Sequence, residues 1–263
     1  MGRYQQTLTA EIKPQQAKPV YNRIMLSLDR QNAWRAVYCA SHPDWQPATE
    51  LFAARVRANL TPQARLLDVG CGRGGLVEQL DHPARLVVGV DPDFSSLREH
   101  RLPALRRAAA VSDILPFMAG SFDVIAASWL LEHLPDPAAA FAEASRVLRP
   151  GGAFVFITPN ARHPLAWANR SLGRLGRLQG RLVSRFYGRA EADTFPTAYR
   201  ANTPDALASL AGGAALRLET LDCVADPTYL AFSQPLFRAL SAFEDRLPVD
   251  RRIHLVGVAR KPD

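Results

Sequence analysis

A glycine-rich turn and two carboxylates carry most of the chemical information in this chain. Residues 66–75 have the sequence LLDVGCGRGG, so a short apolar run leads through Asp68 into Gly70, Cys71 and Gly72. Alternating glycines allow a tight turn in which backbone N–H groups closely approach a ligand. The spacing also fits the G-x-G-x-x-G pattern of nucleotide-binding turns. The segment is therefore predicted to join a buried strand to a helix and to bind a nucleotide-like ligand at the junction.

Asp68 distinguishes between the nucleotides that such a turn binds. A pyrophosphate would be repelled by a carboxylate just before the first glycine, whereas a cationic amino group would be attracted to it. S-adenosylmethionine has this amino group, a sulfonium and an adenosine, and it has no phosphate. Asp91 ends a second apolar run 23 residues after Asp68 and can accept both hydroxyls of a ribose. The combination predicts S-adenosylmethionine as the cofactor.

Further segments follow in an order that resembles a known family. Residues 113–117 and 120–125 are DILPF and GSFDVI, residues 128–134 are SWLLEHL, and residues 148–154 are LRPGGAF. Together with the turn, they resemble the class I S-adenosylmethionine-dependent methyltransferases, over residues 65 to 160 or about a third of the chain. The resemblance implies an α/β fold, a Rossmann-like three-layer sandwich around a seven-stranded, mostly parallel sheet whose last strand is antiparallel and lies between the fifth and sixth.

The resemblance also implies a set of cofactor-binding residues, because ligands of such sheets bind beyond the carboxyl ends of the strands. Asp68, Gly70 and Gly72 are expected at the methionine end, Asp91 at the ribose, Asp113 and Ile114 at the adenine, and Ser128 near the methyl group. Cys71 and Pro92 complete the set. Cys71 fills a position that needs a small side chain, and we do not expect it to react.

Methyl transfer from a sulfonium mainly requires alignment and exclusion of water, and a general base helps when the acceptor is a hydroxyl. His133, His163 and Tyr199 are the candidate catalytic residues, and Arg200 is a candidate substrate contact. His133 follows the fourth strand and His163 lies in a loop that is expected to face the same cleft. A capping role for His133, a turn role for His163 and a surface position for Tyr199 and Arg200 remain open.

Positive charge is concentrated in one part of the chain. The net charge of the 263 residues is +7, and residues 161–190 contain seven arginines and no acid. Arg174 and Arg177 belong to a stripe at helical spacing and are candidate substrate contacts. The stripe fits a solvated basic face, a lid that pairs with an anionic acceptor or carrier, or a peripheral membrane contact. Nucleic acid is the partner that this local patch favours least.

Strand and helix patterns alternate along most of the chain, which predicts a parallel sheet with helices on both faces. The strands are expected near residues 65–69, 85–90, 107–111, 122–128, 152–158, 216–224 and 253–259. The helices are expected near residues 21–38, 49–59, 74–80, 94–100, 138–147, 203–210 and 236–247. This organisation predicts four parts: a flexible arm and N-terminal helical cap (1–60), a cofactor-binding core (61–160), a basic helical insertion or lid (161–202), and a C-terminal completion of the sheet (203–263).

The predicted function is methylation of a small metabolite, with a hydroxyl as the favoured acceptor, in the cytoplasm. Three cysteines fit neither a disulfide framework nor the spacing of metal ligands, so we expect no metal. Methylation of a tRNA base or amine is the alternative enzyme activity. A regulatory domain that binds S-adenosylmethionine without turnover is the alternative outside enzymes. Oligomeric state has no signal in the sequence.

Overall fold

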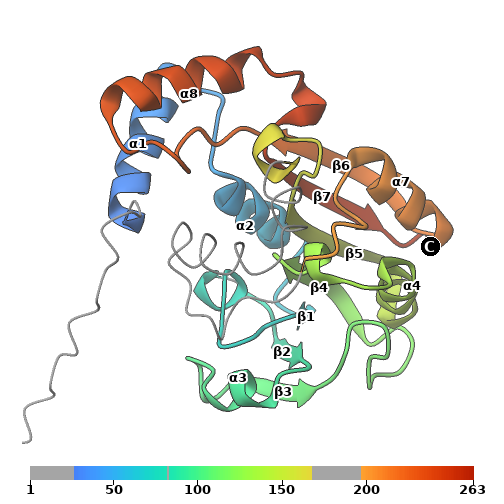
Figure 1. The fold of residues 1–263 in the computed structure, drawn as a ribbon. Coiled ribbons are helices and arrows are strands. Elements are labelled where there is room, and N and C mark those ends of the chain that lie inside the picture. Colours follow the sequence, from blue (N-terminus) through green and yellow to red (C-terminus); the bar gives the residue numbers. More distant parts are fainter. Residues whose placement is uncertain (1–26, 82, 168–196) are drawn as a thin grey trace, which may run out of the picture.

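The computed structural model describes residues 27–81, 83–167 and 197–263 (Figure 1). Within these ranges, seven strands form one sheet in the order β3-β2-β1-β4-β5-β7-β6. The strands are β1 (Arg65–Val69), β2 (Leu86–Asp91), β3 (Arg106–Ala109), β4 (Phe122–Ser128), β5 (Leu148–Pro159), β6 (Arg217–Val224) and β7 (His254–Arg260). Among the described strands, β7 alone runs opposite to the others, and it lies between β5 and β6 and pairs with both in antiparallel fashion. The predicted sheet is confirmed.

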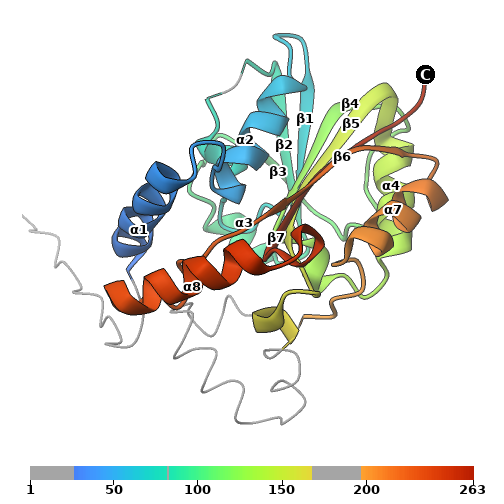
Figure 2. The same cartoon turned by 90° about the horizontal axis from the view of Figure 1, so that it is seen from above.

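Helices cover both faces of the sheet (Figure 2). They are α1 (Leu28–Ser41), α2 (Ala48–Ala58), α3 (Phe94–Arg98), α4 (Pro137–Val147), α7 (Pro204–Gly213) and α8 (Gln234–Arg246). One face carries α2, which contacts β5 and β7, while α4 and α7 lie side by side on the other. Among the described helices, none is long and apolar enough to span a membrane.

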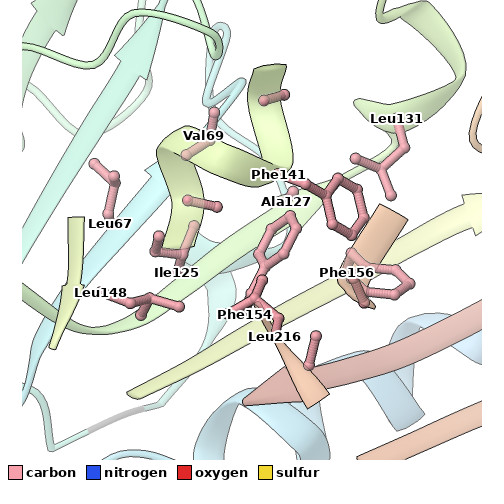
Figure 3. Close-up of a cluster of buried hydrophobic side chains, with 14 of the residues drawn as sticks. Leu67, Val69, Ile125, Ala127, Leu131, Phe141, Leu148, Phe154, Phe156 and Leu216 are labelled. Atoms are coloured by element: carbon pink, nitrogen blue, oxygen red, sulfur yellow. The ribbon is translucent and has the colours of Figure 1, made fainter. Parts of the chain in front are cut away.

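The two faces are built by alternation along the strands. On β4, Ile125 belongs to the cluster beneath α4, while Val124 and Ala126 belong to the cluster beneath α2. Figure 3 shows the first cluster, where Phe141 of α4 packs edge-on against Phe154 of β5 at a ring-centroid distance of 5.2 Å. Because the described strands other than β7 run in the same direction, their carboxyl ends meet at one edge of the sheet.

Two helices form a second layer outside this core. Trp34 of α1 stacks on Phe237 of α8 with ring centroids 4.6 Å apart. The Tyr38 hydroxyl donates a 2.7 Å hydrogen bond to Asp245. The two helices therefore lie side by side, as both views show (Figures 1 and 2).

The structure differs from the sequence-based expectation at the end of the glycine turn. The helix expected over residues 74–80 was wrong, because only a 3-10 turn, η1 (Val77–Gln79), is present there. Gly74 has φ = +107° and Leu80 is extended, so neither end can continue a helix. The expected stretches 1–26 and 168–196, with the candidate contacts Arg174 and Arg177, lie outside the described residues. The arm and the basic insertion therefore stay predictions.

Candidate functional site

The glycine turn follows β1 and is held against the end of β2. Gly70 and Gly72 have φ values of +78° and +50°, in the left-handed region that favours glycine. The N–H groups of Gly70 and Cys71 both donate to the carbonyl of Val90, at 2.8 and 3.1 Å. The sequence therefore encodes the shape of the turn through glycines and fixes its position through the neighbouring strand.

Asp91 joins the turn to the following loop. One carboxylate oxygen, Oδ2, accepts the N–H of Gly72 at 2.9 Å, and Oδ1 accepts the N–H of Asp93 at 2.8 Å. Burial raises the pKa of Asp91, and these two hydrogen bonds act in the opposite direction. Each oxygen keeps a lone pair, so the carboxylate can still accept ligand hydroxyls.

Asp68 is the most perturbed carboxyl at this edge. Its side chain is 4% exposed, and its Oδ1 has no hydrogen-bond partner. Burial raises its pKa to about 7, and the charges of Asp91 and Glu78 add to the increase. An uncompensated carboxylate in the interior is unfavourable, and a cation beside it would remove the cost. A cationic group of a ligand could therefore bind beside Asp68.

The adenine end of the expected site has exposed apolar side chains. Ile114 is 72% exposed, and its backbone forms a bridge with Val111 just beyond β3. Phe94, which the sequence analysis missed, begins α3 and is 64% exposed. Ala110 donates its N–H to the carbonyl of Asp91 at 3.2 Å, so the two loops are adjacent. The position of Phe94, three residues after Asp91, could have indicated this apolar contact from the sequence.

Cys71 lies within the turn and Ser128 lies next to it. The Cys71 thiol packs on Gly89, where a Cβ would lie 2.7 Å from its sulfur. Burial, with the charges of Asp68 and Asp91, raises the pKa of this thiol to about 12, so it stays protonated and unreactive near neutral pH. Ser128 Oγ would lie 3.6 Å from a Cβ on Gly75, which places it beside the turn.

Three candidate residues, His133, Tyr199 and Arg200, come together in the loops after β4 and before α7. His133 ends η2 (Leu131–His133), and the carbonyl of Glu132 accepts the N–H groups of Ala198 and Tyr199 at 2.7 and 3.1 Å. Arg200 donates to the carbonyl of Pro135 at 2.6 Å. The segment that carries Tyr199 and Arg200 is therefore attached to the loop that carries His133, although about 65 residues separate them in sequence.

A buried polar network supports this attachment, and the sequence analysis missed it. Thr158 of β5 donates to Glu132 Oε2 at 3.0 Å and accepts a hydrogen bond from the amide of Asn202 at 2.5 Å. Asn202 also accepts the N–H of Ala161 at its carbonyl, at 2.7 Å. In the sequence, this network is indicated only by polar residues within apolar runs, and such residues occur for many other reasons.

The structure places His163 differently from the expectation that it faces the cleft. Its side chain has no exposed surface, and its Nε2 lies 2.9 Å from Oε1 of Glu244 on α8. Its Nδ1 accepts the N–H of Leu165 at 3.1 Å. Both ring nitrogens are therefore engaged, and the residue holds α8 against the loop after β5. By contrast, the His133 side chain is 22% exposed.

A small cavity of about 130 Å³ lies beyond the ends of β5 and β6. Its lining is mainly apolar and includes Leu165, Pro227, Tyr229, Leu240 and Phe243. Tyr229 bonds His254 through its hydroxyl at 2.8 Å, and the His254 ring contacts Trp129 edge-on at 5.2 Å. Trp129 follows Ser128, so this chain of side chains connects the cavity with the turn region.

The strand order, the glycine turn and the acidic strand ends define the class I methyltransferase fold. Comparison with solved structures agrees, because an S-adenosylmethionine-dependent methyltransferase from Mesorhizobium loti is similar with a TM-score of 0.57, at 22% identity, over 82% of this chain and 98% of that one. Residues 67–156 match the family described as "Methyltransferase domain". Over these residues the chain is therefore similar to methyltransferase domains, and its fold is the one that S-adenosylmethionine-dependent methyltransferases share.

Two curated relatives are both named ubiquinone biosynthesis O-methyltransferase. The protein from Hahella chejuensis is 38% identical over 110 residues, which are 39% of this chain and 46% of the relative. The protein from Nitrosococcus oceani is 39% identical over 116 residues, which are 41% of this chain and 49% of the relative. The chain thus spans about half the length of the curated relatives that it matches.

Proposed function

We propose that this protein transfers the methyl group of S-adenosylmethionine to a hydroxyl oxygen of a small metabolite. The observation that carries the proposal is buried Asp68, with its unpartnered oxygen, beside the glycine turn and Asp91. A cationic, phosphate-free cofactor fits this acidic edge. The names of the relatives support oxygen as the acceptor atom, because both are O-methyltransferases.

The cofactor residues proposed from the sequence keep their roles. Asp68 and the backbone of Gly70 and Gly72 bind the methionine end, and Asp91 binds the ribose. Asp113 and Ile114 bind the adenine, with Phe94 as an added apolar contact, and Ser128 lies near the methyl group. When bound, the cofactor supplies an activated methyl group and a neutral thioether leaving group. The chain then has to align the acceptor with that methyl group and to exclude water.

On the acceptor side, His133 is the proposed general base. A base must reach the acceptor hydroxyl, and the partly exposed imidazole of His133 meets this condition better than the enclosed imidazole of His163. Tyr199 and Arg200 border the same loop and are proposed to contact the acceptor. The apolar cavity near Leu240 would hold an apolar part of it, since a cavity of about 150 Å³ is large enough for benzene.

The wider setting is also part of the proposal. The three cysteines are free thiols, which supports a reducing, cytoplasmic location. Arg174 and Arg177 are proposed to attract an anionic acceptor, its carrier or a membrane surface, and this part rests on the sequence alone.

Methyl transfer from labelled S-adenosylmethionine to a panel of phenols, alcohols and amines tests the function. We expect labelled ether products from hydroxyl acceptors and release of S-adenosylhomocysteine. His133→Gln should lower kcat more for alcohols than for acidic phenols, because phenols ionise without a strong base. Cofactor binding without transfer to any acceptor would favour a regulatory domain, and transfer to amines alone would contradict the proposed O-methylation.

A further inference from the structure

Glu78 places a second carboxylate directly over the glycine turn. A Cβ on Gly74 would overlap this carboxylate, so the two residues are in close contact. The Glu78 side chain is 9% exposed, and its Oε2 has no hydrogen-bond partner. Its Oε1 forms a 2.5 Å ion pair with Arg101, whose N–H donates to the carbonyl of Arg73 in the turn at 3.0 Å. The backbone of Arg101 is therefore held against the turn, and the ion pair lies beside it.

His100 and Asp68 complete a cluster around Glu78. His100 is 4% exposed, and its Nε2 also lacks a partner. Burial lowers the pKa of His100 while the charge of Glu78 acts to raise it, and the same charge contributes to the raised pKa of Asp68. Glu78 is thus within electrostatic reach of both. A buried polar atom without a partner destabilises the protein, so three of them in one cluster, on Asp68, Glu78 and His100, indicate a missing ligand.

We infer that Glu78 and Arg101 are the receptor for the amino-acid end of the cofactor, with Glu78 and Asp68 binding its ammonium group and Arg101 its carboxylate. The inference rests on the proposed function of the site. An amino acid carries one charge of each sign, and the Glu78–Arg101 pair presents the two complementary charges side by side. In this structure the two residues bind each other. When the cofactor enters, each exchanges its partner for the opposite group of the ligand.

The Arg101 side chain is 58% exposed, so its guanidinium can change partners without breaking buried packing. Its planar guanidinium matches a carboxylate in two-point geometry. His100 Nε2 is the remaining unpartnered atom and offers a further hydrogen bond to the same group. The cluster therefore recognises a zwitterion rather than a phosphate, which agrees with the acidic residue before the turn.

Calorimetry with two ligands tests this inference. S-adenosylhomocysteine has the amino-acid end, and 5′-methylthioadenosine lacks it while keeping the adenosine and sulfur. In Glu78→Gln and Arg101→Gln we expect S-adenosylhomocysteine to bind about 10- to 100-fold more weakly, since charge-assisted contacts are lost. Binding of 5′-methylthioadenosine should change less than about twofold. Glu99→Gln is the matched control, because it removes the nearby ion pair to Arg73 on a 62% exposed side chain, and it should leave both affinities unchanged.

The outcomes separate this inference from the function on which it rests. Unchanged S-adenosylhomocysteine affinity in both variants would overturn the receptor role and leave the methyltransferase proposal standing, provided that the wild type binds both ligands. An equal loss for both ligands would also overturn it, since Glu78 would then only support the turn. If the wild type binds neither ligand, the proposed function fails and the inference fails with it.

Discussion

Asp68→Asn tests whether the acidic site is destabilising until the cofactor fills it. Burial, assisted by Asp91 and Glu78, raises the pKa of this carboxyl from its ordinary value of 3.8 to about 7. In the unfolded chain the group ionises near its ordinary pKa. Between the two values the folded state therefore binds more protons than the unfolded state, and stability falls as the pH rises. Asparagine has nearly the same shape and no charge, so the variant should lose this dependence.

The magnitude follows from the shift of about 3 pKa units, or about 4 kcal/mol at a pH above both values. Nearly half of this effect is already present at pH 5, because the unfolded group is ionised there. The free energy of unfolding of Asp68→Asn should thus rise relative to the wild type by about 2–3 kcal/mol between pH 5 and pH 8. Urea unfolding without cofactor at both pH values measures this difference. A difference that does not change with pH would refute the argument.

We expect the same carboxyl to make cofactor binding release protons. At pH 7 about half of the folded molecules carry a proton on Asp68, and a bound ammonium group lowers the pKa and expels it. Calorimetry in buffers of different ionisation enthalpy should show a release of about half a proton at pH 7 and almost none at pH 9. Asp68→Asn should bind S-adenosylhomocysteine more weakly and abolish this release. Equal release in the variant would show that another group is responsible.

Three further substitutions test the turn, the ribose contact and the cavity. Asp91→Ala should weaken the binding of S-adenosylmethionine by about 2–3 kcal/mol, since paired hydrogen bonds to the ribose are lost. NAD that binds the wild type more tightly than S-adenosylmethionine does would contradict the proposed cofactor site. Gly70→Val should abolish cofactor binding with a native circular dichroism spectrum, because Gly70 has φ = +78° and a Cβ would lie 3.0 Å from Leu130; full affinity would show that the turn does not contact the ligand. Leu240→Trp should raise the acceptor KM without changing cofactor affinity, while Leu236→Trp, at a 38% exposed position one turn earlier on α8 and outside the cavity lining, should change neither quantity; equal effects would exclude the cavity as an acceptor site.

The sequence predicted the sheet, and the positions of the glycine turn and the acidic strand ends within it, because these depend on local patterns. Buried strands appear as short apolar runs, and the residue that follows each run lies at the carboxyl edge. Asp68 and Asp91 could therefore be placed beside the turn without any structure. The cap of α7 was equally visible, since Thr203 accepts the N–H of Ala206 and Pro204 takes the first helical position.

The acceptor side could not be predicted in the same way, because it depends on contacts between distant segments. His163 is buried by Glu244, which is 81 residues away, and no local pattern indicates that pairing. The attachment of Tyr199 to Glu132 is also long-range. Glu78 was missed for another reason: the stretch was assigned to a helix, and in the structure a 3-10 turn directs its side chain over Gly74.

The hydrogen bond between Ala161 and Asn202 has a consequence for how the chain between them can vary in length. The chain leaves β5 and returns at almost the same point, where the N–H of Ala161 meets the carbonyl of Asn202 at 2.7 Å. For a flexible connection with fixed ends, doubling the length costs only about 0.6 kcal/mol of closure entropy. Changes of chain length between these two residues would thus leave the sheet in place only if they keep the contacts of His163 with Glu244 and of Tyr199 with Glu132.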